Sequence, residues 1–335
     1  MSETKGRRPR MEDIAREAKV NRITVSRALS RPELVAKDTL ARIEEVVARL
    51  GYIPDQVARG MKAERSRIVS LAAPVQMSGV YGAISEMLTQ TLYNDGLVVN
   101  HFPLTDEIDQ REAAMRELAG WRPAVIVLMS SILTDAMGQT LRNAHAPVVE
   151  LLSWDPDSLG TCVGYDNRLA ARRLTEHLVE RGRRRIAYVH SANPLNALNE
   201  TRFRGFTDCI DDTAGAAGTE WRVQPGYAEG VRLIDDMFAG GTQPEAILCG
   251  SDMVAVGALQ ACLARGISVP DDLAICAFDG TELTAVTHPA ITSLDYPLER
   301  VADVGASEIQ RLADKPDDPI RRVKIEARVQ QRATT

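Results

Sequence analysis

The run MEDIAREAKVNRITVSRAL (residues 11–29) decides how the beginning of the chain folds. Apolar side chains recur at helical spacing from Met11 to Ala18 and again from Arg22 to Leu29. Asn21, directly before the second of these segments, is a residue type favoured as an N-cap. Two short helices joined by a turn of three or four residues form a helix-turn-helix, and this is the structure that we predict.

A third helix is predicted from Ala36 to Leu50, because apolar residues line one side of it and Gly51 follows as a C-cap. Pro32 ends the helix before it. Pro54 suits the entrance of a further short helical segment, Gln56–Lys62, and residues 64–67 are polar and typical of a linker. The first part of the chain is therefore predicted to be a small helical head.

From Ile68 onward, short apolar runs alternate with segments of helical periodicity. The predicted strands are Ile68–Ala73, Leu97–Phe102, Ala124–Met129, Val148–Leu152, Arg185–His190, Ala246–Cys249 and Leu273–Phe278. The predicted helices are 80–94, 107–119, 134–144, 167–181, 199–212, 227–239 and 253–265. This alternation predicts an α/β fold with parallel sheets covered on both faces, in two similar halves, 68–162 and 163–292. The last strand, Ile320–Val329, alternates like an edge strand.

Charge is distributed unevenly along the 335 residues. Residues 1–67 carry 16 basic and 10 acidic side chains, a net +6, whereas the remainder carries −12. A basic head on an acidic body favours a polyanion as the partner of the head, although small helical segments often differ by a few charges. The five scattered cysteines fit the reducing cytoplasm, and the charged N-terminus without an apolar segment predicts no secretory signal.

The motifs of common enzyme classes are missing. The sequence has no G-x-G-x-x-G, no G-K-[ST] and no H-E-x-x-H. The segment Gly160–Gly164 approaches a nucleophile elbow with Cys162 at its centre, but a small buried cysteine in a strand is the favoured interpretation. We therefore expect no enzyme activity, no cofactor and no metal.

The second helix of the helix-turn-helix carries side chains suited to DNA. Arg22 and Arg27 can each donate two hydrogen bonds to a guanine, and Ile23 can contact a thymine methyl group. The short hydroxyl side chains of Thr24 and Ser26 suit contacts to phosphates, and Asn21 is a further candidate for DNA binding. The alternative is a charged, solvated helix in a small bundle.

The chain resembles the LacI-type transcriptional regulators over nearly its whole length. The residues that carry the resemblance are Asp13–Ala15, Val20, Thr24–Arg27, Leu50–Pro54, Tyr165–Asn167, Gly182, Arg184–Ala187, Arg202, Gly205, Phe206, Ser251, Asp252, Ala255, Gly257, Val269–Leu273, Phe278, Asp279 and Pro289–Thr292. Within that family, Pro147–Leu151 and Val163–Asn167 are most similar to the gluconate-utilisation repressors.

For the head, the resemblance implies that Arg22, Ile23 and Arg27 contact bases. It also implies a hinge helix over Asp55–Lys62 that folds on DNA and enters the minor groove. The DNA-contacting residues expected in that hinge are Val57, Ala58 and Met61. Lys19 occupies a place in the turn where the family often has glycine, so we expect it to be mildly strained.

For the body, the resemblance implies a two-lobed periplasmic-binding-protein-like domain that dimerises and binds an effector. Arg202 would hold a carboxylate and Asp252 would accept hydrogen bonds from hydroxyl groups, which suits a sugar or sugar acid. Alternatives are a surface ion pair of Arg202 with Glu200 or Asp208, and an N-cap role for Asp252 in a helix starting at Met253. Further candidates for the effector site are Tyr81, Ser130, Trp154, Asp166 (also a predicted N-cap) and Tyr227.

These observations predict a DNA-binding headpiece (1–54), a hinge and linker (55–67) and an effector-binding and dimerisation domain (68–335). Its lobes would comprise residues 68–162 with 297–335, and residues 163–294. The predicted function is that of a homodimeric regulator, a repressor of sugar or sugar-acid use that an effector releases from a palindromic operator. A solute-binding protein and an α/β enzyme with a helical appendage are the rival interpretations.

Overall fold

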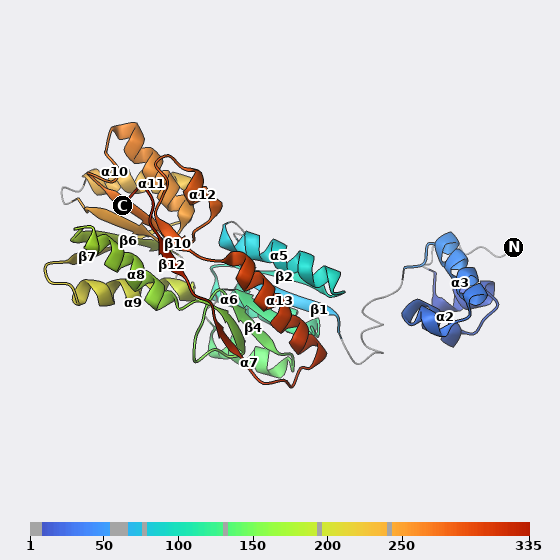
Figure 1. The fold of residues 1–335 in the computed structure, drawn as a ribbon. Helices are drawn as coiled ribbons and strands as arrows, with labels where there is room; N and C mark the ends of the chain where they lie inside the picture. The colour runs from blue at the N-terminus through green and yellow to red at the C-terminus, as the bar shows by residue number, and fades with distance from the viewer. Residues whose placement is uncertain (1–8, 54–65, 76–78, 130–132, 193–195, 240–242) are drawn as a thin grey trace. The chain divides into compact units, whose positions relative to one another are not determined.

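The computed structural model describes residues 9–53, 66–75, 79–129, 133–192, 196–239 and 243–335. The chain divides into two compact units, Met1–Ser66 and Arg67–Thr335. We call the first unit the headpiece and the second the body. Figure 1 colours both by residue number.

The described part of the headpiece is helical. Its elements are α1 (Met11–Glu17), α2 (Arg22–Ser30), the 3-10 turn η1 (Pro32–Leu34) and α3 (Lys37–Leu50). Asn21 caps α2 as predicted, because its Oδ1 accepts a 2.7 Å hydrogen bond from the backbone N–H of Thr24. Lys19, with φ of 55°, has the left-handed backbone expected in the turn. Fully buried Ile14, Val25 and Ile43 bring the three α-helices around one small core.

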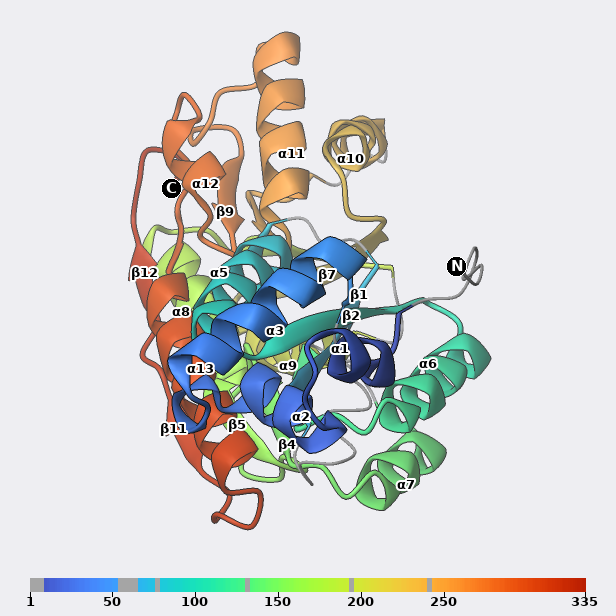
Figure 2. The ribbon, with the colours of Figure 1, turned by 90° about the vertical axis from the view of Figure 1, so that its right-hand side faces the viewer.

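The body contains two separate parallel sheets, and we call the part built around each sheet a lobe (Figures 1 and 2). The first lobe has six strands in the order β11-β5-β4-β3-β1-β2. Its elements are β1 (Ile68–Pro74), α5 (Val80–Asn94), β2 (Val98–Leu104), α6 (Ile108–Gly120), β3 (Val125–Met129), α7 (Asp135–Asn143), β4 (Val148–Leu151), β5 (Thr161–Gly164), α13 (Leu298–Asp314) and β11 (Arg322–Lys324). Helices α5 and α13 pack together on one face, and α6 and α7 pack together on the other.

The second lobe has a four-stranded sheet in the order β7-β6-β8-β9, with a small antiparallel pair, β10 and β12, beside it. Its elements are α8 (Asn167–Glu180), β6 (Arg185–Ser191), α9 (Ala197–Asp211), β7 (Ala217–Val223), α10 (Tyr227–Ala239), β8 (Ala246–Cys249), α11 (Asp252–Arg265), β9 (Ala274–Ala277), α12 (Glu282–Val286), β10 (Ser293–Asp295) and β12 (Arg328–Gln330). Helices α8 and α9 cover one face, and α10 and α11 cover the other.

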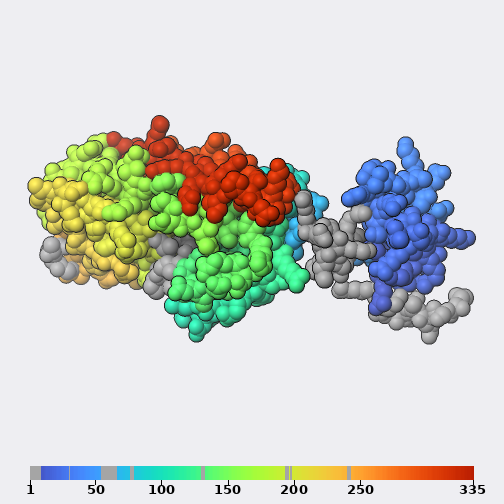
Figure 3. All heavy atoms as spheres, turned by 90° about the horizontal axis from the view of Figure 1, so that it is seen from below, coloured from blue at the N-terminus to red at the C-terminus, as the bar shows by residue number. Residues whose placement is uncertain are grey.

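The chain passes between the lobes three times, at residues 165–166, 296–297 and 325–327. The rings of Tyr165 and Tyr296, in the first two passages, meet edge to face with centres 4.3 Å apart. The N–H of Ile325, in the third passage, donates a 2.7 Å hydrogen bond to the carbonyl of Gly164 at the start of the first. The three passages therefore lie side by side, and Figure 3 shows the C-terminal residues running along one face beside residues from the middle of the chain.

The predicted α/β fold with two parallel-sheet lobes is confirmed, and all seven predicted strands are present. The single strand predicted over Ile320–Val329 is wrong. It is two strands, because buried Ile325 and Ala327 lie where the chain leaves the first sheet. Thr334 then hydrogen bonds with Ile275 of β9. The end of the segment 297–335, which was predicted to belong to the first lobe, therefore contacts the second lobe.

Candidate ligand site and nucleic-acid interface

The guanidinium of Arg202, on α9, lies at the centre of a buried polar cluster. Its Nε donates to Asn167 Oδ1 (2.9 Å), its Nη2 to the Tyr165 hydroxyl (2.8 Å) and its Nη1 to the Gly250 carbonyl (3.4 Å). Its carbon Cζ is 3.8 Å from the centre of the Phe278 ring, a cation–π contact. We call the following residues the arginine cluster: Tyr165, Asn167, Arg202, Asp252, Phe278 and Asp279.

The arginine cluster is assembled at the carboxyl ends of parallel strands. Tyr165 follows β5, Asp252 follows β8, and Phe278 and Asp279 follow β9. Arg202 reaches them from α9, a helix that Asn196 caps through its side chain. Ligands of open α/β sheets bind beyond the carboxyl ends of the strands, so this is the place in the body where a small molecule is expected.

Asp252 does not cap the helix that follows it. The helix α11 starts at Asp252 itself, after Ser251, so the predicted N-cap role is wrong. The carboxylate instead accepts hydrogen bonds from the backbone N–H groups of Asp279 (3.1 Å) and Thr281 (2.8 Å) and from the Thr281 hydroxyl (2.7 Å). Because Asp252 is only 3% exposed and its oxygens are occupied, it holds the 279–281 loop in place.

Asp279 is the more accessible carboxylate of the cluster. Its Oδ1 lies 3.6 Å from Arg202 Nη1, and its side chain is 21% exposed. Burial and the neighbouring Asp252 raise the pKa of Asp279 to about 7, against the opposing effect of Arg202. Burial also raises the pKa of Asp252. Sequence reasoning quoted the Phe278-Asp279 pair but did not select Asp279 as a site residue.

Two tyrosine hydroxyls near the arginine cluster are buried without a hydrogen-bond partner among the described residues. They belong to Tyr188 on β6 and Tyr296 in the second passage between the lobes. Both are 5% exposed or less, and burial raises the pKa of each hydroxyl against the smaller opposing effect of Arg202. Buried polar groups are normally paired, so these hydroxyls are candidates to pair with a bound molecule.

The other predicted effector residues are only partly brought to this place. Tyr81, on α5, is half-buried and close enough to influence the pKa of Arg202. Asp166 caps α8 as predicted and contacts Lys324 (3.2 Å), and Lys324 lies 4.5 Å from the Trp154 ring centre. The backbone N–H of Trp154 donates to the backbone carbonyl of cluster residue Tyr165. Tyr227 lies at the start of α10 and is 49% exposed, unlike buried Arg202 and Asp252.

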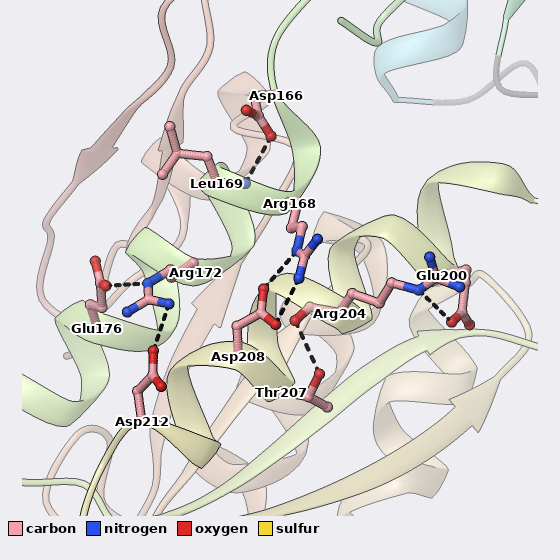
Figure 4. Close-up of polar contacts among 10 residues, drawn as sticks. All are labelled: Asp166, Arg168, Leu169, Arg172, Glu176, Glu200, Arg204, Thr207, Asp208 and Asp212. Carbon is pink, nitrogen blue, oxygen red and sulfur yellow. Dashed lines mark hydrogen bonds and ion pairs between the residues drawn. The ribbon is translucent and has the colours of Figure 1, made fainter. Parts of the chain in front are cut away.

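The alternative role of Arg202 in a surface ion pair is wrong. Figure 4 shows that the two proposed partners are engaged elsewhere. Glu200 pairs with Arg204 (3.1 Å), whereas Asp208 forms a two-pronged pair with Arg168 on α8 (2.6 and 2.9 Å). Both residues are thus engaged in exposed ion pairs, one within α9 and one between α8 and α9, whereas Arg202 belongs to the buried cluster.

The headpiece presents a polar face on α2. Arg22, Ile23 and Arg27 are exposed, Ile23 to 69%, while Val25 and Ala28 on the other side are buried. Thr24 and Ser26 are half-buried, and Asn21 accepts hydrogen bonds from the Thr24 N–H and hydroxyl. An exposed helix face of this kind has the dimensions and donors to enter a DNA major groove.

Four predicted site residues, Val57, Ala58, Met61 and Ser130, lie outside the described residues. Cys162 is a buried residue of β5, as the favoured interpretation expected. Within the described ranges, no three metal-ligating side chains gather at one point. No helix in those ranges has the length and apolar character needed to span a membrane.

Comparison with known proteins finds matches in both units. Residues 10–55 match the family described as bacterial regulatory proteins, lacI family, and residues 175–335 match a periplasmic binding protein-like domain. The HTH-type transcriptional regulator GntR of Escherichia coli (strain K12) is 28% identical over 309 residues, covering 91% of this chain and 92% of that protein.

Two solved structures show the same fold. One is a LacI-family transcriptional regulator from Silicibacter pomeroyi, with a TM-score of 0.88, 22% identity and coverage of 97% of this chain and 99% of that one. The other is the lac repressor dimer bound to operator and the anti-inducer ONPF, with a TM-score of 0.83, 20% identity and coverage of 98% and 99%.

Proposed function

Because the chain belongs to the lacI family of bacterial regulatory proteins, a family of DNA-binding transcriptional regulators, we propose that it is a repressor. In this proposal it binds a palindromic operator as a homodimer and is released when a small-molecule effector binds the body. The operon would encode proteins for the use of a carbohydrate or a gluconate-like sugar acid.

The exposed face of α2 is the observation that carries the DNA-binding part of the proposal. Arg22, Ile23 and Arg27 point away from the headpiece core, and their side chains match guanine edges and thymine methyl groups. The described residues 9–53 also form a core of their own, which suits a rigid platform for these three side chains.

A homodimer would place one headpiece on each half of the operator. The lac repressor of similar fold is a dimer on its operator. In this chain, β2 is an edge strand of the first sheet, and Tyr93 on α5 and Val98 on β2 are 71% and 54% exposed. We propose that a second copy covers this apolar surface.

The arginine cluster supports a ligand rich in hydroxyl groups. Most N–H groups of Arg202 are already used by Asn167, Tyr165 and Gly250, while Asp279 can accept hydrogen bonds and the hydroxyls of Tyr188 and Tyr296 are unpaired among the described residues. A sugar satisfies these groups without adding charge. A sugar acid would place its carboxylate at Arg202 beside Asp279, so its binding would require a protonated Asp279.

Operator binding is tested with the full chain and a pool of randomised DNA duplexes. Selection should enrich a palindrome, and affinity for it should fall steeply between about 50 and about 200 mM salt, as phosphate contacts require. Enrichment of no sequence, together with a flat salt dependence, would contradict the repressor proposal.

Effector binding is tested by thermal denaturation with gluconate, glucose, galactose, ribose and 6-phosphogluconate as probes. A ligand at one hundred times its Kd adds about 2.7 kcal/mol to the stability of the folded state. Adding the successful probe should also release the selected operator. If only a purine or an amino acid raises the melting temperature, the regulator remains and the sugar class is wrong.

A further inference from the structure

A carboxylate lies directly beside the first DNA-facing arginine of the headpiece. Glu12, on α1, contacts Arg22 on α2 with 3.0 Å between Oε1 and Nη1. Both side chains are more than half exposed, Glu12 to 54% and Arg22 to 61%. The pair therefore lies on the surface that α2 presents, and not in the core between the helices.

This ion pair contributes little to the stability of the headpiece. Exposed ion pairs are screened by water and contribute little to stability, and the helices are held together by buried residues such as Ile14 and Val25. The same short helix supplies a second ion pair, Glu17 (31% exposed) with Arg49 on α3 (60% exposed) at 2.6 Å. Glu17 therefore has the same charge, the same helix and the same type of partner as Glu12, but its partner is not on α2.

A negative charge on a DNA-facing surface opposes binding to phosphates. Without Glu12, the long side chain of Arg22 is free to turn to the nearest phosphate, a contact that adds affinity for any sequence. With Glu12, one side of the guanidinium is occupied and its direction is restricted. The pair also matches one G·C base pair, because arginine donates to guanine O6 and N7 and glutamate accepts from the N4 amino group of the paired cytosine.

We propose that Glu12 is a positioning residue that sets the base specificity of Arg22 by holding its guanidinium for a G·C base pair and away from the phosphates. This inference rests on the proposed DNA-binding function. It assigns a specificity role to α1, outside the helix whose side chains were selected from the sequence.

The test compares four forms of the full chain on randomised DNA duplexes: the unchanged protein, Glu12→Gln, Glu17→Gln and Arg22→Met. The Arg22→Met variant identifies the base-pair position at which Arg22 acts, because preference is lost there. At that same position, the base-pair preference of Glu12→Gln should be about tenfold weaker than that of the unchanged protein, a difference of about 1.4 kcal/mol. Glu17→Gln should retain the full preference, and equal melting temperatures of the glutamine variants establish that the headpiece is intact.

A second measurement separates positioning from a general loss of negative charge. On a duplex without the selected sequence, Glu12→Gln should bind more tightly than the unchanged protein. Its plot of log K against log salt concentration should be steeper by about 0.9, because Arg22 gains one phosphate contact. Glu17→Gln removes the same charge without this steepening. The proposal is overturned if Glu12→Gln keeps the full preference or if Glu17→Gln loses as much. If the unchanged protein shows no preference for any sequence, the DNA-binding function itself is wrong.

Discussion

Arg202 and Asp279 come from different elements of the second lobe, and their nearest charged atoms, Nη1 and Oδ1, lie 3.6 Å apart. Arg202 is 7% exposed and also holds Asn167 and Tyr165 through hydrogen bonds. The guanidinium thus joins α9, the 279–281 loop and the first passage between the lobes. Replacing Arg202 therefore changes the stability of the body as well as the binding of any ligand.

We expect Arg202→Met to lower the free energy of unfolding by about 3 kcal/mol, because it leaves a carboxylate and two polar groups without their charged partner. Arg204→Met is the matched control, since Arg204 lies on the same helix but pairs with Glu200 at the surface and should cost less than about 1 kcal/mol. Urea unfolding of both variants measures the difference. Equal losses would contradict the central position of Arg202.

Asp279 should make stability fall as the pH rises. Its pKa in the folded protein is about 7, raised by burial and by Asp252 from the ordinary 3.8. Between pH 3.8 and pH 7, the folded state therefore keeps a proton that the unfolded state has lost. The stability that this proton contributes is fully present below pH 3.8 and is lost as the pH rises through 7. Asp279→Asn should lack this decline, as urea unfolding at a series of pH values would reveal.

The same proton distinguishes the two effector classes. A sugar acid at Arg202 should bind more tightly below pH 7, where Asp279 is neutral, whereas a neutral sugar that donates to the Asp279 carboxylate should bind more tightly above it. Titration calorimetry of the successful probe at both sides of pH 7 measures this difference. A pH-independent affinity would mean that the ligand does not contact Asp279.

His190 should have the opposite effect on stability. It is buried on β6, with Nε2 2.7 Å from Glu220 Oε1, and its Nδ1 has no partner among the described residues. Burial lowers the pKa of His190 below 6.5, although Glu220 opposes this. The stability that the neutral His190 side chain contributes is therefore present above pH 6.5 and is lost as the pH falls through the lowered pKa. His190→Gln should show a weaker acid-induced loss in thermal unfolding, relative to its own stability at pH 8.

The N-cap of α2 supports the DNA-facing residues. Asn21→Ala should destabilise the headpiece by about 1 kcal/mol, because the N–H of Thr24 loses its acceptor. Asn21→Ser, which keeps a capping oxygen, should cost much less. Operator affinity and headpiece melting should decline together in the alanine variant only. A loss of affinity with unchanged melting would instead indicate a direct contact of Asn21 with DNA.

Local signals in the sequence were sufficient for much of the fold. Asn21, Lys19 and Gly51 act through hydrogen bonds and dihedral angles within a few residues, so their roles followed from residue type and position. The central strands are short apolar runs because both sheet faces are covered. By contrast, β7 is an edge strand with mostly exposed residues and has no apolar run, and it was not predicted.

Contacts between distant residues could not be predicted in the same way. Asp252 follows a serine at the start of a helix, which favours a cap, yet its carboxylate binds backbone groups 27 and 29 residues later. The burial of Arg202 depends on Phe278 and Tyr165, which three-dimensional packing alone brings together. Helix α13 was left unassigned despite its buried apolar side, which includes Val301 and Ile309.

The three passages between the lobes restrict how the body can move. A single flexible connection would let the lobes translate, twist and bend independently, but three adjacent connections of two or three residues oppose translation and twisting together. Bending about a line through the passages is the movement that stretches none of them. The rings of Tyr165 and Tyr296, which meet edge to face, belong to two of these passages, so the arginine cluster, which includes Tyr165, lies next to this line.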